Sequence, residues 1–178
     1  LLPHAQIHWL CGPLKEQVES LPAQPDYILA NHIIDDMILS AAGEPDEHKK
    51  NFSWASAYEH APTFDFEKSW QQGLANPAAL AACKKTVEEE LASVIKRLHP
   101  HCLILNQYPS STLYDHGLGL VNDHAYSVFT ALEATFRTNL TDRQQLQVIL
   151  NTHPNFGNAH IGEHILNAKY WMLWRPQK

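Results

Sequence analysis

The stretch NPAALAACKKTVEEELASVIKRLHPHCLILN, residues 76–106, decides the fold class because it joins a long amphipathic helix directly to a buried strand. Asn76 can cap this helix, and Pro77 suits its first position. Pro100 ends it, because the residue before a proline is driven out of the helical region. The apolar positions recur every three or four residues and form one stripe: Leu80, Cys83, Val87, Leu91, Val94 and Leu98. The apolar run at 102–106 is typical of a strand buried on both faces, so the segment predicts an α/β protein.

The residues before this segment repeat the alternation of strands and helices. The runs at 6–11 (QIHWLC) and 26–31 (DYILAN) favour strands, and 14–21 (LKEQVESL) can form two helical turns. Residues 40–76 are polar and rich in turn residues, yet they hold six large aromatic side chains, which a disordered linker usually lacks. We interpret this segment as an ordered insertion or lid with one or two short helices.

Two further helices and a pair of strands are expected after residue 106. Asn122 or Asp123 can cap a helix with one apolar face, formed by Ala125, Phe129, Leu132 and Phe136. Thr141 and Gln144 have the spacing of a capping box, which places the start of the next helix near Asp142. Residues 160–166 and 169–175 favour an antiparallel pair of strands. The order of these elements predicts an α/β sheet protein that ends in an antiparallel hairpin.

The segment HIGEH, residues 160–164, contains the H-x-x-E-H order of a zinc-protease signature. Two histidines four residues apart share one face of a helix, whereas on a strand they stand about 13 Å apart and cannot hold one tetrahedral ion. Gly162 weakens a helix here, and Ile165 and Trp171 favour strands. The sequence therefore predicts no metal site.

Composition excludes several classes of partner. The chain has 178 residues and a formal net charge of −6, without a basic stripe that could follow a nucleic acid backbone. No apolar run reaches the length of a membrane span, and LLPHAQIHWL at the start has no features of a signal peptide. The three cysteines form no C-x-x-C pair. We therefore expect a cytoplasmic protein with no nucleic acid and no membrane as partner.

Four segments together resemble the C-terminal part of the class I S-adenosylmethionine-dependent methyltransferases. PDYILANHIIDDM (25–37) is similar to the fourth strand of that family and the polar turn after it. ELASVIKRLHPHCLILNQYPS (90–110) resembles its next helix, turn and fifth strand, with His101-Cys102 in place of the usual glycine pair. HIGEHILNAKYWMLWRP (160–176) resembles the terminal hairpin, and IHWLCGPLKEQVESLPAQ (7–24) the third strand and its helix.

The chain departs from the family by lacking its glycine-rich loop and its first two strands. The resemblance implies a Rossmann-like, mostly parallel sheet with a C-terminal antiparallel hairpin, in which the strands at 26–31 and 102–106 are adjacent and parallel. In that family the fourth strand also pairs with the first, so the strand at 26–31 is expected to have one unpaired edge. We therefore expect residues 1–178 to be a single, partial domain whose sheet is completed by an upstream segment or a partner chain.

The resemblance implies a site at the carboxyl ends of the strands, where open α/β sheets bind ligands. S-adenosylmethionine would contact Gly12, Pro13, Leu14, Asn31 and His32, and Asn106 and Tyr108 would lie on the acceptor side. His32 is the candidate general base, although a role in helix entry is equally compatible with its position. Asp35 and Asp36 favour a structural role in the first helical turn, where carboxylates stabilise the helix dipole.

The aromatic insertion would lie over this edge of the sheet. Trp54, Tyr58, His60 and Trp70 either wall an acceptor pocket or pack the insertion onto the domain. Two functions follow from the resemblance: methyl transfer from S-adenosylmethionine to a small-molecule acceptor, or a non-catalytic methyltransferase-like subunit that works by association. The absent glycine-rich loop favours the second, and the polar turns with the aromatic segment favour the first.

Overall fold

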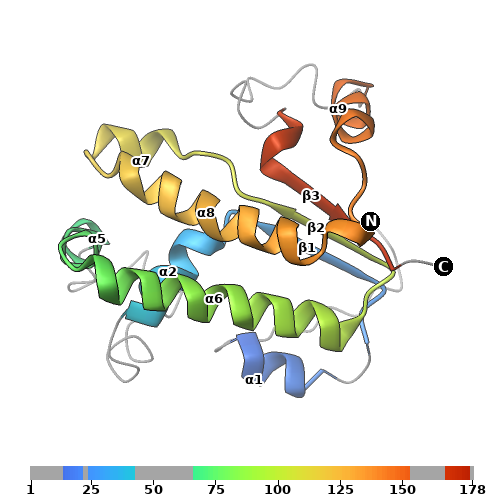
Figure 1. The fold of residues 1–178 in the computed structure, drawn as a ribbon, viewed down its shortest axis with the longest axis horizontal. Coiled ribbons are helices and arrows are strands. Elements are labelled where there is room, and N and C mark those ends of the chain that lie inside the picture. Colours follow the sequence, from blue (N-terminus) through green and yellow to red (C-terminus); the bar gives the residue numbers. More distant parts are fainter. Residues whose placement is uncertain (1–13, 22–23, 43–65, 153–166, 177–178) are drawn as a thin grey trace, which may run out of the picture.

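The computed structural model describes residues 14–21, 24–42, 66–152 and 167–176, and Figure 1 shows how their elements are arranged. The expected strands at 6–11 and 160–166 lie outside these residues, as does the H-x-x-E-H segment. The helices are α1 (Leu14–Glu19), α2 (Ile34–Ala42), α5 (Phe66–Leu74), α6 (Pro77–Leu98), α7 (Ser111–Asp115), α8 (Gly119–Thr135) and α9 (Arg143–Thr152). Two short 3-10 helices, η1 (Arg137–Asn139) and η2 (Ala168–Tyr170), and three strands, β1 (Tyr27–Asn31), β2 (Cys102–Asn106) and β3 (Trp171–Trp174), complete the described elements.

The described strands form one sheet in the order β1-β2-β3. β1 pairs with β2 in parallel from Tyr27–Cys102 to Asn31–Asn106, as the sequence predicts. The strand expected at 169–175 is present at 171–174, where β3 pairs antiparallel with β2. Its expected partner at 160–166 lies outside the described residues. The described strands thus make one parallel and one antiparallel pair, and the fold belongs to the mixed α/β class.

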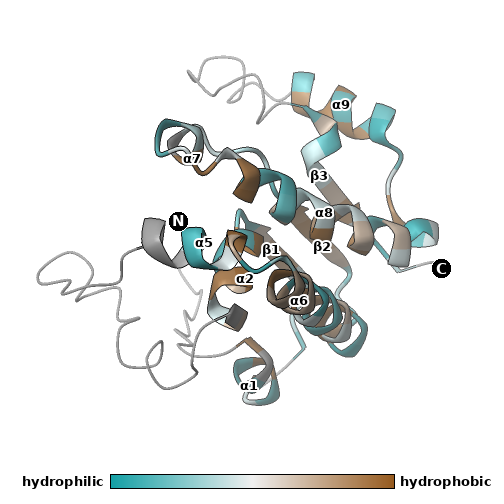
Figure 2. Cartoon of the chain, turned by 60° about the vertical axis from the view of Figure 1, so that its left-hand side comes forward, coloured by the Kyte–Doolittle hydropathy of each residue, from teal (hydrophilic) through white to brown (hydrophobic). Residues whose placement is uncertain are grey.

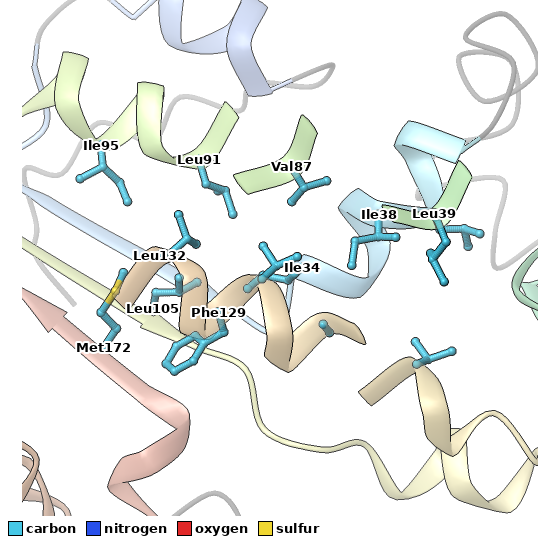
Figure 3. Packing of buried hydrophobic residues seen from close by; sticks show 14 of the residues in the cluster. Ile34, Ile38, Leu39, Val87, Leu91, Ile95, Leu105, Phe129, Leu132 and Met172 are labelled. Atoms are coloured by element: carbon cyan, nitrogen blue, oxygen red, sulfur yellow. The ribbon is translucent and has the colours of Figure 1, made fainter. Parts of the chain in front are cut away.

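Helices α2, α6 and α8 cover one face of the sheet and enclose the main hydrophobic core (Figures 1 and 3). Leu105 and Met172 point from β2 and β3 toward Phe129 and Leu132 of α8. Because these four side chains are almost completely buried, each contributes about 1.5–3 kcal/mol to folding through burial of apolar surface. The predicted apolar faces of α6 and α8 are therefore the faces that build the core.

The opposite face of the sheet is covered only in part by the described residues. Leu146 and Leu150 of α9 pack against Leu173 of β3 and the neighbouring part of β2. On β1 the same face is open, because Tyr27 is 77% exposed and Leu29 is 72% exposed. Among the described residues β1 also pairs with β2 alone, so its second edge carries no described strand.

The bounds of α6 follow from the residues at its two ends. Asn76 accepts a hydrogen bond from the Ala79 backbone N–H at its side-chain Oδ1, at 3.2 Å, and Pro77 is the first helical residue. His99 closes the helix in the left-handed conformation, with φ of 41°, and Pro100 follows. The apolar residues of α6 lie on the side that faces the core, and the polar residues lie mainly on the other side (Figure 2).

Two of the predicted helix caps are wrong. α8 begins at Gly119, earlier than expected, and neither Asn122 nor Asp123 caps it. The Asn122 side chain instead accepts from the Ser110 backbone N–H and donates to its carbonyl oxygen, which ties α8 to the segment after β2. α9 begins at Arg143 as expected, but the Asp142 carboxylate takes the place of Thr141 and accepts from the Gln144 N–H at 2.8 Å.

The remaining expectations concern the insertion and membrane spans. α5 confirms a short helix within 40–76, and residues 43–65 of that segment lie outside the described part of the chain. Across the described residues, none of the helices combines the length and the apolar character that crossing a membrane requires.

Candidate functional site at the carboxyl ends of β1 and β2

The carboxyl ends of the two parallel strands bring His32 next to Asn106. The His32 backbone N–H donates to the Asn106 carbonyl oxygen at 3.0 Å, which extends the ladder by one bond beyond β1. His32 has φ of 52°, a left-handed conformation that costs a non-glycine residue about 1–2 kcal/mol. Such backbone strain is found at functional sites when the surrounding structure holds it in place.

Gln107 connects the end of β2 to the start of α2. Its Oε1 accepts from the Ile34 backbone N–H at 3.1 Å, and its Nε2 donates to Asp35 Oδ1 at 3.4 Å. Its own backbone N–H donates to the Tyr170 carbonyl oxygen at 3.0 Å. Gln107 is only 3% exposed, so these bonds are formed away from water. The buried amide of Gln107 thus forms hydrogen bonds both with a free backbone N–H in the first turn of α2 and with the Asp35 carboxylate.

The imidazole of His32 lies between a carboxylate and an aromatic ring. His32 Nδ1 is 3.4 Å from Asp35 Oδ1, and its ring centre is 4.7 Å from that of Tyr108. Its Nε2 is buried and has no hydrogen-bond partner. A carboxylate beside Nδ1 favours the proton on that nitrogen, which leaves the lone pair of Nε2 available to accept. This arrangement suits a general base.

Asn106 adds a second polar atom without a partner at the same strand ends. Its side chain is buried, with 4% of the residue exposed, and Oδ1 accepts no hydrogen bond. A buried polar atom that lacks a partner costs about 1–3 kcal/mol. Such costs are tolerated where a ligand supplies the missing partner, so Asn106 and His32 make this edge a candidate binding site.

Asp36 carries the clearest electrostatic signature of the region. Burial of its carboxylate, the neighbouring Asp35 charge and, in the opposite direction, His32 together raise its pKa from 3.8 to about 6. The residue as a whole is solvent-exposed, so the carboxylate is crowded by its neighbours rather than enclosed. A raised pKa at the mouth of a polar turn is typical of a functional site.

The other predicted site residues fall into three groups. Asn31 lies beside His32 at the exposed end of β1. Leu14 begins α1 and packs against the core, and Trp70 is 1% exposed within the main core. Trp70 therefore packs α5 onto the domain. The other predicted site residues lie outside the described part of the chain: Gly12, Pro13, Trp54, Tyr58 and His60.

Sequence reasoning missed the contribution of two residues. Gln107 follows Asn106 directly but is not among the predicted site residues, and Asp35 is assigned only a helix-dipole role. The position of Gln107 at the end of a buried strand was a usable signal. Its link to Asp35 joins residues 72 apart in the sequence, and no local pattern reveals such a contact.

The described residues support neither a metal site nor a ligand site in the hollow between α6 and α8. In the described ranges, no three histidine, cysteine, aspartate or glutamate side chains are grouped so that they could hold a metal ion. An open hollow of about 210 Å³ lies between α6 and α8, away from the strand ends. Its lysines already have partners: Lys84 contacts His124 and Ser127, and Lys85 pairs with two glutamates.

Comparison with known proteins returned no match to any family model, to any curated protein or to any solved structure. The function therefore has to be inferred from the geometry of the site.

Proposed function

We propose that this chain forms the acceptor-side part of an S-adenosylmethionine-dependent methyltransferase that acts on a small molecule, with His32 as general base. The observation that carries the proposal is the imidazole of His32, which faces a carboxylate with Nδ1 and leaves a buried Nε2 without a partner. A histidine in this state can take a proton from a hydroxyl or amino group in a bound acceptor.

The residues around His32 fit a positively charged cofactor. Asp35 and Asp36 place two carboxyl groups at the start of α2, and carboxylates attract a cation most strongly where water is partly excluded. Asn31 lies at the exposed strand end beside them. Asn31 and His32 would therefore face the methionine end of the cofactor and its methyl group, as the family resemblance implies.

The proposed chemistry is an in-line displacement at carbon. S-adenosylmethionine, when bound, supplies a methyl group on a positively charged sulfur that leaves as a neutral thioether. His32 Nε2 takes the proton of an acceptor hydroxyl as the new bond to carbon forms, or takes a proton from an acceptor ammonium before its nitrogen attacks. Asp35 stabilises the imidazolium, and Tyr108 covers one side of the ring. The remaining contribution is positioning of the two reactants.

The strand order supports the same proposal. β1 and β2 correspond to the fourth and fifth strands of the family by sequence resemblance, and they are parallel neighbours. The strand matched to the end of the terminal hairpin, β3, is antiparallel to β2. A Rossmann-like sheet would then continue from the second edge of β1, where an upstream segment or a partner chain would add the remaining strands.

One observation favours the alternative of a non-catalytic, methyltransferase-like subunit. The outer face of β1 exposes Tyr27 and Leu29, and the second edge of β1 is not paired among the described residues. An edge strand with exposed apolar side chains favours association with another chain. Catalysis and association make different predictions for His32, which allows one experiment to separate them.

The test combines calorimetry with single-turnover kinetics. S-adenosylmethionine is titrated into the wild-type protein, complete with the upstream segment or partner chain that finishes its sheet, and into the same protein carrying His32→Ala. Transfer of a labelled methyl group to a panel of small hydroxyl and amino compounds is then followed. We expect His32→Ala to bind the cofactor nearly as well as wild type and to transfer the methyl group roughly 10²–10⁴-fold more slowly, because a base acts mainly in the transition state.

The chain contains a matched control for this variant. At the opposite ends of the same strands, His101 Nδ1 lies 3.2 Å from Asp26 Oδ1, with both side chains exposed. His101→Ala removes an equivalent histidine–aspartate pair and should leave the transfer rate unchanged. Failure of the wild-type protein to bind S-adenosylmethionine would exclude the enzyme and favour the association function. Normal turnover in His32→Ala would assign His32 a structural role.

A further inference from the structure

We propose that Gln107 is a positioning residue that holds the Asp35 carboxylate against His32 and so fixes the proton of the imidazole on Nδ1. The inference rests on the proposed role of His32 as a base and names the residue that prepares it. It concerns the folded protein before any ligand binds, so it can be tested without cofactor or acceptor.

The orientation of the Gln107 amide follows from its two partners. The Ile34 backbone N–H can only donate, so the atom of Gln107 that faces it at 3.1 Å must be the oxygen. The amide nitrogen is then turned toward Asp35 Oδ1, at 3.4 Å. One buried amide therefore sets both the first turn of α2 and the direction of the Asp35 carboxylate.

The same carboxylate oxygen faces both Gln107 and His32. Asp35 Oδ1 is 3.4 Å from Gln107 Nε2 and 3.4 Å from His32 Nδ1. Both distances are at the long end of the range for hydrogen bonds, as is common in catalytic sites before the reactants bind. Asp35 is itself buried, so its charge needs these donors in place of water. Loss of the amide would let the carboxylate turn away from His32.

Gln107 is well placed to act as a rigid support. Its backbone N–H is bonded to Tyr170 just before β3, and its side chain spans from β2 to α2. Three hydrogen bonds on a residue that is 3% exposed leave the side chain little freedom. A base held in one tautomer presents Nε2 as an acceptor, so the site selects an acceptor molecule that offers a hydroxyl or amino hydrogen there.

The tautomer of His32 can be measured directly by long-range ¹H–¹⁵N correlation spectroscopy of the imidazole, recorded over a series of pH values. Comparison with His32→Ala identifies the signals. We expect the Nδ1–H form to predominate in the wild-type protein. In Gln107→Leu the ratio of Nδ1–H to Nε2–H should fall about tenfold, which corresponds to the loss of one hydrogen bond to a charged group.

Gln147 provides a matched control with the same bonding pattern elsewhere in the fold. Its Oε1 accepts from the Ala168 backbone N–H at 2.9 Å, and its Nε2 donates to Asn151 Oδ1 at 2.9 Å. Gln147→Leu should lower stability in a similar way but leave the His32 tautomer as in wild type. If Gln107→Leu does not fold, Gln107→Met replaces it, because its unbranched side chain has a similar length and a thioether has no hydrogen to donate to Asp35.

The outcomes separate this inference from the proposed function. Wild-type His32 in the Nε2–H form, or an unchanged ratio in the folded Gln107 variant, would overturn the positioning role. A lower ratio of Nδ1–H to Nε2–H in Gln107→Leu, with an unchanged ratio in Gln147→Leu, supports the positioning role. A protein that shows this shift but binds no S-adenosylmethionine would retain the positioning role and lose the methyltransferase function.

Discussion

Replacing Asp36 by asparagine should stabilise the protein at neutral pH and have little effect in acid. The pKa of Asp36 rises from 3.8 to about 6 on folding, chiefly because burial of the carboxylate disfavours its charge. Between these two values the folded protein keeps a proton that the unfolded chain releases, so stability declines as the pH rises from about 4 to 6. Asparagine does not ionise, so the stability of Asp36→Asn should not decline in this way as the pH rises.

The size of the effect can be bounded from the structure. Each unit of pKa difference corresponds to about 1.36 kcal/mol, so a pKa that rises from 3.8 to about 6 sets an upper limit of about 3 kcal/mol. Asp36 is exposed, so solvent screens much of this cost. The dipole of α2 also favours a charged carboxylate in its first turn by about 0.3–1 kcal/mol. We therefore expect Asp36→Asn to raise the free energy of unfolding by about 1 kcal/mol at pH 7.5.

The assay is urea unfolding of both proteins at pH 4, 5, 6 and 7.5, followed by tryptophan fluorescence. The difference in free energy of unfolding should grow with pH and level off above pH 6. Asp115→Asn, at the exposed end of α7, controls for the loss of one negative charge from the whole protein. If the difference in free energy of unfolding between Asp36→Asn and wild type did not change with pH, the idea that the surroundings of Asp36 raise its pKa would be refuted.

Four further substitutions, one of them a control, test the fold by equilibrium unfolding and sedimentation. Asn76→Ala removes the cap of α6 and should cost about 1 kcal/mol of unfolding free energy. Phe129→Ala removes a fully buried ring from the centre of the core and should cost about 3–5 kcal/mol, whereas Val148→Ala on the exposed side of α9 should change little. Leu29→Lys replaces a side chain on the edge strand that is 72% exposed, so it should leave the stability of the single chain unchanged. It should weaken any concentration-dependent association that sedimentation velocity shows for the wild-type protein.

Much of the fold could be predicted because its elements are encoded by local patterns. The bounds of α6 follow from Asn76, Pro77 and Pro100, and each of these acts on residues within one turn of itself. β2 coincides with the apolar run at 102–106 because a strand buried between two neighbours carries little polar alternation. The parallel pairing of β1 with β2 came from the family resemblance and is confirmed.

The errors arise where a polar side chain has a choice of partners. Asn122 has the right chemistry for a helix cap, but it binds the Ser110 backbone, which only the folded chain brings within reach. Thr141 has the right spacing for a capping box, but its backbone N–H pairs with Leu173 of β3, and the adjacent Asp142 caps α9. Tertiary pairing of the flanking backbone therefore displaced the local signal by one residue.

The candidate site was located by position and only partly by its contacts. His32 and Asn106 were placed at the strand ends because parallel strands finish on the same edge of a sheet. The network behind them was not predicted, since Gln107 reaches Ile34 and Asp35 across more than 70 residues of sequence. Local sequence therefore indicates where chemistry can occur, and the tertiary contacts determine which groups are prepared for it.

The energetics of His32 favour a chemical role for this edge over a purely structural one. The left-handed backbone costs about 1–2 kcal/mol, and two buried polar atoms without partners, on His32 and Asn106, add about 1–3 kcal/mol each. A scaffold could avoid these costs with a glycine at position 32 and apolar side chains around it. Association through the open edge of β1 requires none of these groups, because the exposed Tyr27 and Leu29 serve it alone. A fold that retains several kcal/mol of local strain at the carboxyl ends of its parallel strands has the pattern expected when activity, rather than stability, determines the residues there.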